Sequence, residues 1–249
     1  MESSPHSPFA ASVPRRAFLR YSGAGLALTG LVLAGCDDDD DDDNNTAGEV
    51  NVGAVGAGDV GVLNYAYALE QLEAAFYAQI KTGTYYTGLN ASSAERQILD
   101  DIAGHEKIHA DFFKTVLGNS AIKVLEPDFS SINFADRTSV LNAAKAFEDL
   151  GVAAYNGAGR FITAPANLVL AGKIVSVEAR HAALIRDLIT YNSFVANDVV
   201  DLFTPTGSAS NPGVGNGTGM EKGKRPADVV ATANTFLKAG SKLNVSGLV

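Results

Sequence analysis

A histidine that follows a glutamate by three residues occurs twice in the sequence, and each of these pairs comes after another glutamate further upstream. Residues three apart lie on one face of an α-helix, so each Glu-x-x-His pair points an oxygen and a nitrogen ligand in the same direction. The duplication predicts two helical halves whose polar groups meet. In chain order the six residues are Glu70, Glu106, His109, Glu148, Glu178 and His181.

These polar residues lie on helix faces that are otherwise apolar or small. Ile102, Ala110 and Phe113 share the expected face of Glu106 and His109. Burying a carboxylate or an imidazole on such a face costs free energy unless a partner compensates it. Four carboxylates and two imidazoles together suit two ions of iron or manganese. The pattern therefore predicts a two-metal site. A bundle that keeps its helices and has lost the metal is the alternative.

The first half contains one more acid than the second. Glu73 lies three residues after Glu70, on an adjoining part of the same helix face, so helix geometry alone does not choose between them. The internal repeat does choose, because it matches Glu70 with Glu148 and Glu73 with Gly151. We therefore expect Glu70 and Glu148 to be the bridging carboxylates. Glu73 is expected to be a near neighbour that binds a transient ion or reaches solvent.

The order Glu, Glu-x-x-His, Glu, Glu-x-x-His resembles the ferritin-like superfamily over residues 59–191. Each upstream glutamate also precedes a tyrosine by seven residues, Tyr77 in the first half and Tyr155 in the second. The resemblance implies that these tyrosines lie near the metals, where they hydrogen-bond a ligand or pass an electron in catalysis. It also implies an all-α fold, a four-helix bundle with a long crossover between the second and third helices.

Helix-start signals agree with this fold. Asp59 is expected to cap the first helix, and Ser92 with Glu95 forms a capping box for the second. Residues 119–135 show no steady helical period, so they are expected to be the long crossover. Pro165 suits the first position of the last helix. The four expected helices span about residues 59–81, 92–118, 136–161 and 165–191.

The first 36 residues read as a processing signal rather than as part of the fold. Arg15 and Arg16 begin the string RRAFLR, which resembles a twin-arginine export signal, and the apolar stretch 23–33 is too short to span a bilayer. The string LAGC follows and resembles a bacterial lipobox, with Cys36 as the lipidated residue. Cys36 is the only cysteine, so no intramolecular disulfide can form. We expect export to the cell envelope or cell surface, with a lipid anchor in a membrane.

Charge and composition divide the remainder of the chain. Residues 37–43 are seven consecutive aspartates, whose mutual repulsion predicts an extended, disordered tether over residues 37–58. The bundle is expected to occupy residues 59–195, and residues 196–249 a loop-rich extension with a short helix. With a net charge of −9, the chain shows no sign of a nucleic-acid-binding surface.

The string HEKIH also matches HExxH, the zinc-protease pattern in which His105 and His109 bind zinc and Glu106 is the general base. The duplication argues against a protease, because the position that matches His105 in the second half is Val177. A protease also needs a third ligand and a strand edge that holds its substrate, and the sequence shows no strand pattern. We expect His105 to be a neighbour of the site or a surface residue.

The resemblance implies an exported oxidoreductase of oxidase or ferroxidase type, with a role in stress protection. Its cofactor would be two ions of iron or manganese, and its reactant dioxygen or peroxide. The alternative is a metal-poor ferritin-like scaffold that serves as a stress or interaction module at the cell surface. A homodimer is compatible with either function, since the sequence does not determine the oligomeric state.

Overall fold

The computed structural model describes residues 49–53, 58–202 and 217–248 of the chain. The twin-arginine string, the lipobox with Cys36 and the aspartate run lie outside the described residues, as does most of the expected tether. Among the helices of the described part, none combines the length and the apolar character that a membrane crossing requires.

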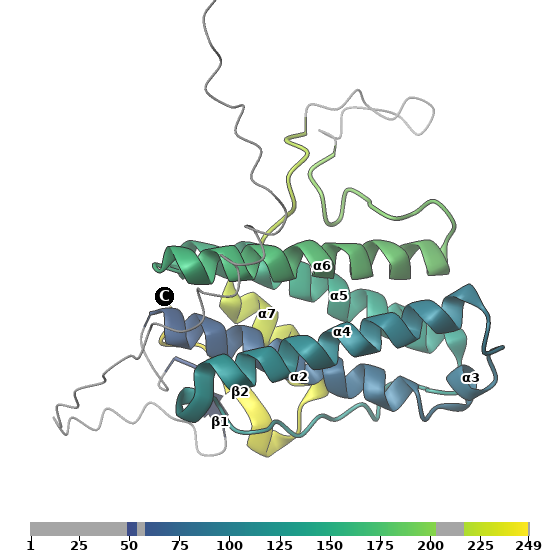
Figure 1. Cartoon of the computed structure of the whole chain (residues 1–249), viewed down its shortest axis with the longest axis horizontal. Coiled ribbons are helices and arrows are strands. Elements are labelled where there is room, and N and C mark those ends of the chain that lie inside the picture. The colour runs from purple at the N-terminus through teal and green to yellow at the C-terminus, as the bar shows by residue number, and fades with distance from the viewer. Residues whose placement is uncertain (1–48, 54–57, 203–216, 249) are drawn as a thin grey trace, which may run out of the picture. The chain divides into compact units, whose positions relative to one another are not determined.

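Four long helices form the body of the protein (Figure 1). Helix α2 packs along α4, and α5 packs along α6, so the two halves of the sequence form two helix pairs. A short helix, α3 (Thr84–Thr87), lies between α2 and α4, and residues 118–136 make the long crossover from α4 to α5. The expected all-α bundle with a crossover between its second and third long helices is confirmed. The bounds are Asp59–Ile80 for α2, Ala94–Leu117 for α4, Arg137–Ala158 for α5 and Pro165–Ile189 for α6.

Side chains just before the helices set two of the helix starts. The hydroxyl of Ser93 accepts a hydrogen bond from the backbone N–H of Arg96 at 3.3 Å, so Ser93 caps α4 and the capping box expected at Ser92 is wrong by one residue. Ser92 is held in the preceding turn, where its N–H and its hydroxyl both donate to the side-chain oxygen of Asn90. Asp136 caps α5, because its carboxylate accepts a hydrogen bond from the backbone N–H of Ser139 at 2.6 Å.

Asp59 does not cap α2, although the sequence suggested that it would. It is the first residue of α2, and its carboxylate accepts hydrogen bonds from the N–H and hydroxyl of Thr163 and from the N–H of Ala164, at 2.7–3.0 Å. The side-chain amide of Asn167 donates a fourth, at 2.8 Å. Asp59 thus fastens the start of α2 to the start of α6. Pro165 occupies the first turn of α6, as expected.

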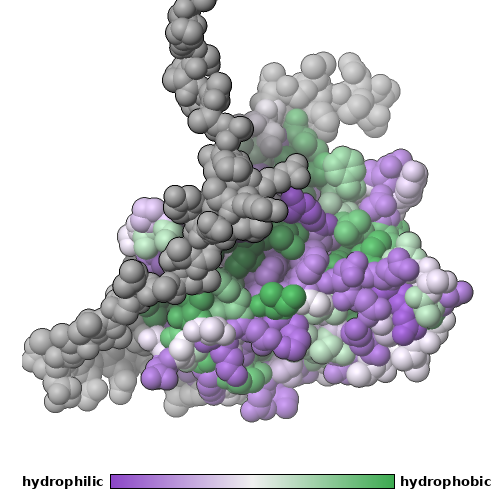
Figure 2. All heavy atoms as spheres, viewed as in Figure 1, coloured by the Kyte–Doolittle hydropathy of each residue, from purple (hydrophilic) through white to green (hydrophobic). Residues whose placement is uncertain are grey.

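The apolar core continues from the bundle into the C-terminal extension. The rings of Phe76 on α2 and Phe147 on α5 have centroids 4.7 Å apart, and the ring of Phe236 also lies 4.7 Å from that of Phe147. Helix α7 (Pro226–Ala233) buries Val229 completely, so the extension covers α5 rather than hanging free of the bundle. The visible face in Figure 2 is largely polar with scattered apolar patches, as expected when most large apolar side chains are inside.

One glycine allows this close cover. The backbone N–H of Lys224 donates to the carbonyl of Ala153 on α5 at 2.9 Å, which brings the extension onto the helix backbone. A Cβ atom added at Gly157 would lie 1.7 Å from the Lys224 carbonyl oxygen. Any larger residue at position 157 would therefore push the two backbones apart.

Two three-residue strands were not foreseen. Strand β1 (Glu49–Asn51) pairs in parallel with β2 (Lys242–Asn244), and Val50 lies opposite Leu243, both side chains buried. Residues 49–53 therefore belong to the folded body, and the tether expected over residues 37–58 does not include them. Three-residue strands give too short a pattern for period-two alternation to reveal.

We predict that Asp59→Ala lowers the free energy of unfolding by about 0.5–2 kcal/mol, because the Asp59 carboxylate accepts hydrogen bonds from backbone N–H groups at the start of α6 much as a capping side chain does. Burial alone would raise the pKa of Asp59, but hydrogen bonds from Thr163, Asn167 and Ala164 outweigh it and lower the pKa from 3.8 to about 2. The stability that the ionised Asp59 carboxylate provides is therefore fully present above about pH 4 and is lost as the pH falls toward 2. Urea unfolding at several pH values measures it.

The exposed Asp101 on α4 supplies the matched control as Asp101→Ala, which should leave stability within about 0.5 kcal/mol of the original. The difference in free energy of unfolding between the original protein and Asp59→Ala should become smaller as the pH falls from about 4 to about 2.5. A gap that stays constant over this range would show that the carboxylate charge of Asp59 does not matter.

Candidate metal centre

The bundle brings the six predicted ligands together at its centre. Helices α2 and α5 each supply one glutamate, and α4 and α6 each supply a Glu-x-x-His pair. All four carboxylates are fully buried, whereas the side chain of His109 keeps 13% of its exposure and that of His181 keeps 3%. The ligand atoms fall into two clusters, in each of which all the atoms lie within 4.8 Å of one another.

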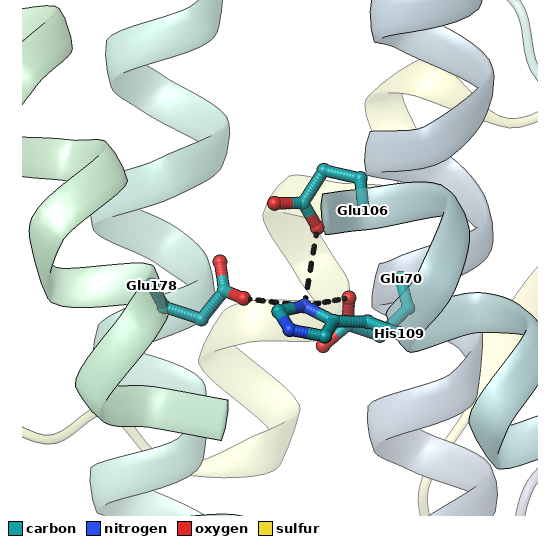
Figure 3. A group of neighbouring side chains, drawn as sticks. All are labelled: Glu70, Glu106, His109 and Glu178. Atoms are coloured by element: carbon teal, nitrogen blue, oxygen red, sulfur yellow. Dashed lines mark ion pairs between the residues drawn. The ribbon is translucent and has the colours of Figure 1, made fainter. Parts of the chain in front are cut away.

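The first cluster surrounds the Nδ1 atom of His109 (Figure 3). Glu178 Oε1 lies 2.8 Å from this nitrogen, Glu70 Oε2 lies 3.3 Å away and Glu106 Oε2 lies 3.8 Å away. Figure 3 shows the three carboxylates approaching the imidazole from three helices, α6, α2 and α4. Four residues thus aim one donor atom each at a common point.

The second cluster repeats this arrangement around the Nδ1 atom of His181. Glu106 Oε1 lies 2.7 Å from this nitrogen, and Glu148 Oε2 and Glu178 Oε2 both lie 3.5 Å away. Each cluster therefore has one imidazole, one glutamate from α2 or α5, and two glutamates from the Glu-x-x-His pairs. The two halves of the sequence are related in space as they are in sequence.

The carboxylates that belong to both clusters are Glu106 and Glu178. Each presents one oxygen to His109 and the other to His181, so these two carboxylates are shared between the clusters. The expectation that Glu70 and Glu148 would bridge is therefore wrong. The reason is that each of these glutamates has one oxygen engaged by a tyrosine, which leaves a single oxygen for a single cluster.

The two predicted tyrosines cross between the helix pairs. The hydroxyl of Tyr77 on α2 donates to Glu148 Oε1 on α5, and the hydroxyl of Tyr155 on α5 donates to Glu70 Oε1 on α2. Burial, together with the nearby carboxylates, raises the pKa of both phenols well above 10, so both stay protonated as donors. Each tyrosine thus lies beside a glutamate that is predicted to be a ligand. A catalytic role for Tyr77 and Tyr155 stays a prediction.

Buried polar atoms without hydrogen-bond partners coincide with this site. In the described part of the chain nine such side-chain atoms occur, and eight are the ligand atoms of the two clusters. The ninth is the hydroxyl of Tyr65. Folded proteins pair nearly all of their buried polar groups, so eight such donor atoms that converge in two clusters are compatible with a metal-binding site.

The electrostatics of the metal-free site show what compensates the charge when no cation is bound. Burial would lower the pKa of His109 and His181, but the surrounding carboxylates outweigh it and raise both values to about 12. Burial would raise the pKa of Glu106, but contacts with these two imidazoles lower it to about 2. Burial raises the pKa of Glu148 to about 8. Protons thus fill the site, and binding of metal must release them.

Glu73 lies beside the site without belonging to either cluster. It is buried, and burial followed by the charges of Glu106 and Glu178 raises its pKa well above 4.5. A Cβ atom added at Gly151 would lie 2.9 Å from Glu73 Oε1, so Gly151 leaves the space that the Glu73 carboxylate fills. Glu73 is the near neighbour that the repeat predicts, and it is buried rather than turned to solvent.

His105 is not part of either cluster. Its side chain is exposed on α4, and its Nδ1 lies 2.9 Å from Nε2 of His181. A zinc-protease site would need His105 and His109 on one ion, but the structure places only His109 among the clustered ligand atoms. The expectation that His105 is a neighbour of the site agrees with this position.

Four long helices around a buried cluster of carboxylates and histidines, with a long crossover in the middle, define a ferritin-like helical bundle. The family model described as the ferritin-like domain matches residues 58–191, more than half of the chain. The protein belongs to this family. A comparison with curated proteins gave no match.

We predict that loss of a shared carboxylate costs more than loss of an unshared one. Glu106→Ala removes an oxygen from each cluster, so it should abolish tight binding of two ions, whereas Glu70→Ala should weaken one ion only. Glu73→Ala should change the affinity modestly, because Glu73 contributes charge and no ligand atom. Anaerobic titration with Fe²⁺ measures the number of ions and their affinities. Equal losses in Glu106→Ala and Glu73→Ala would contradict the assignment.

Proposed function

We propose that this protein binds two ions of iron or manganese in the two clusters and reacts with dioxygen or peroxide, as an oxidase- or ferroxidase-like oxidoreductase. The observation that carries the proposal is the set of eight buried ligand atoms without hydrogen-bond partners. In a purely structural bundle these positions would be filled by apolar side chains, because burying unpaired carboxylates is costly. A bound cation pair would replace the protons that otherwise compensate the charge of the carboxylates.

The donor set favours these metals. Each cluster offers one imidazole nitrogen and three carboxylate oxygens, and the only cysteine of the chain, Cys36, lies outside the described residues. Carboxylate and imidazole donors without thiolate suit iron and manganese better than metals that prefer soft ligands. The resident ions would supply the redox chemistry, with dioxygen or peroxide as the oxidant.

The residues of the chain have separable tasks in this proposal. Glu106 and Glu178 would each contribute to holding both ions, because each carboxylate belongs to both clusters. Tyr77 and Tyr155 fix the orientation of the unshared glutamates and keep a hydroxyl proton within the buried site. The complete burial of the carboxylates excludes bulk water, which strengthens their interaction with a cation.

We propose further that the protein is exported and anchored to a membrane at Cys36. The twin-arginine-like string, the short apolar stretch and the LAGC box support this proposal. Twin-arginine export carries folded proteins, so metal could be bound in the cytoplasm before export. The aspartate run would then separate the anchored residue from the folded body.

The metal proposal is tested on the full chain purified without oxygen. We expect close to two irons or manganeses per chain, and one tightly bound ion fewer in His109→Ala and in His181→Ala, since each histidine is the only nitrogen ligand of its cluster. Circular dichroism should show that the helices persist, because the apolar faces supply most of the stability of a bundle. Lys114→Ala, an exposed change on the same helix as His109, is the matched control.

Reactivity is tested on the same samples. The iron-loaded protein should consume dioxygen or peroxide faster than free Fe²⁺ does, and both histidine variants should lose most of this gain. A wild-type chain that takes up no metal after anaerobic loading would contradict the proposal and favour the metal-poor scaffold. Binding of two ions without faster oxidation would support the metal-binding part of the proposal and contradict the oxidase part.

The lipid anchor has its own prediction. Cys36→Ser should leave the protein unprocessed or free of the membrane, because the thiol is the attachment point of the lipid. Membrane fractionation and the mass of the mature chain measure this outcome. Ser3→Ala, far upstream of the LAGC box, is the control and should change neither. If Cys36→Ser still matures and fractionates with membranes as before, the anchor lies elsewhere.

A further inference from the structure

One exposed side chain contacts a metal ligand from outside the two clusters. His105 on α4 lies against His181 on α6, with 2.9 Å between His105 Nδ1 and His181 Nε2. The two rings are nearly parallel, with an interplanar angle of 16° and centroids 5.1 Å apart. The pair joins α4 to α6, which otherwise make few contacts along the bundle.

The direction of this hydrogen bond follows from the position of the other nitrogen of His181. The Nδ1 atom of His181 points into the second cluster, 2.7 Å from Glu106 Oε1, so Nδ1 is the atom that would bind a metal in place of its proton. The proton of the neutral ring must then be on Nε2, which donates to Nδ1 of His105. His105 is therefore the acceptor, and it fixes both the tautomer and the ring orientation of His181.

The other cluster has no such support from the matching position. His109 is the histidine of the first cluster, as His181 is of the second. By the internal repeat, the residue that would support His109 as His105 supports His181 is Val177. Valine has no side-chain group that could accept a hydrogen bond from an imidazole. The two clusters are alike in their ligands and differ in what holds the imidazole.

We propose that His105 is a positioning residue that makes the two metal positions unequal, so that the ion held by His181 is bound more tightly than the ion held by His109. The proposal rests on the proposed two-metal function. Outer partners that orient a ligating histidine typically change metal affinity by about 10–100-fold. The burial of the two imidazoles agrees, since the side chain of His181 is 3% exposed and that of His109 is 13% exposed.

The test uses Co²⁺ as the probe, added anaerobically to the metal-free full chain and followed by its absorption. The wild type should take up two ions in two distinguishable steps. His105→Val, which copies the residue of the other half, should weaken the tighter step by about 10–100-fold and leave the weaker step unchanged. His105→Gln should restore much of the loss, because its amide oxygen can accept the same hydrogen bond. Lys107→Ala, an exposed change on the same helix, is the control.

A spectroscopic readout separates positioning from a general loss of structure. In the Zn²⁺-loaded, ¹⁵N-histidine-labelled protein, the Nε2 proton of His181 should exchange slowly with water in the wild type and in His105→Gln. It should exchange faster in His105→Val, while the other ligand histidine stays unchanged.

Several outcomes would overturn the inference. They are unchanged affinities in His105→Val, equal weakening of both steps, and a His105→Gln variant that behaves like His105→Val. A wild-type chain that binds no metal would overturn the proposed function together with this inference. A wild type that binds two ions beside an unaffected His105→Val would overturn this inference alone.

Discussion

The burial of four carboxylates within one helical bundle is the constraint on which the rest of the structure depends. Like charges this close repel, and burial strengthens the repulsion because the surroundings are poorly polarisable. The metal-free protein compensates by keeping protons on His109, His181 and several of the acids. The same donor atoms that hold protons without metal are those that would hold two cations. Protons and metal ions would therefore compete for these atoms.

The packing around the site keeps the repelling groups together. Helix pairs α2–α4 and α5–α6 are joined across the centre by the two tyrosine–glutamate hydrogen bonds, one in each direction. Asp59 fastens α2 to α6 at one end of the bundle, and the aromatic rings of Phe76, Phe147 and Phe236 fill the space between α2, α5 and the extension. The polar centre is thus held by contacts that do not themselves involve a metal.

The sequence predicted the four long helices closely and identified the six glutamates and histidines that cluster at the centre, because both depend on spacing within a single helix. A Glu-x-x-His pair fixes two ligands on one face wherever the helix packs. The bridging role was assigned wrongly, since it depends on how helices face one another. The repeat relates Glu70 to Tyr77 within α2, whereas the hydrogen bond to Glu70 comes from Tyr155 on α5.

Local signals near helix ends misled for a related reason. An aspartate before an apolar run is typical of a helix cap, but the Asp59 carboxylate accepts hydrogen bonds at the start of α6, over a hundred residues later in the chain. The pairing of β1 with β2 joins residues still further apart and is too short to leave a pattern. The sequence therefore could not reveal the contacts between distant segments. The close approach of Lys224 to Gly157 is another such contact.

This long-range closure has a consequence for the order in which the molecule is assembled during synthesis. Strand β1 precedes the bundle, yet its partner β2 and the ring of Phe236 emerge from the ribosome after all four long helices. Domains tend to form from the N-terminal side as they are made, but here an early helix bundle has an uncovered side on α5 until the last segment arrives. Synthesis of Phe236 and β2 is thus the step that allows the core to close. Contacts of such large sequence separation form late because closing a long loop is entropically costly.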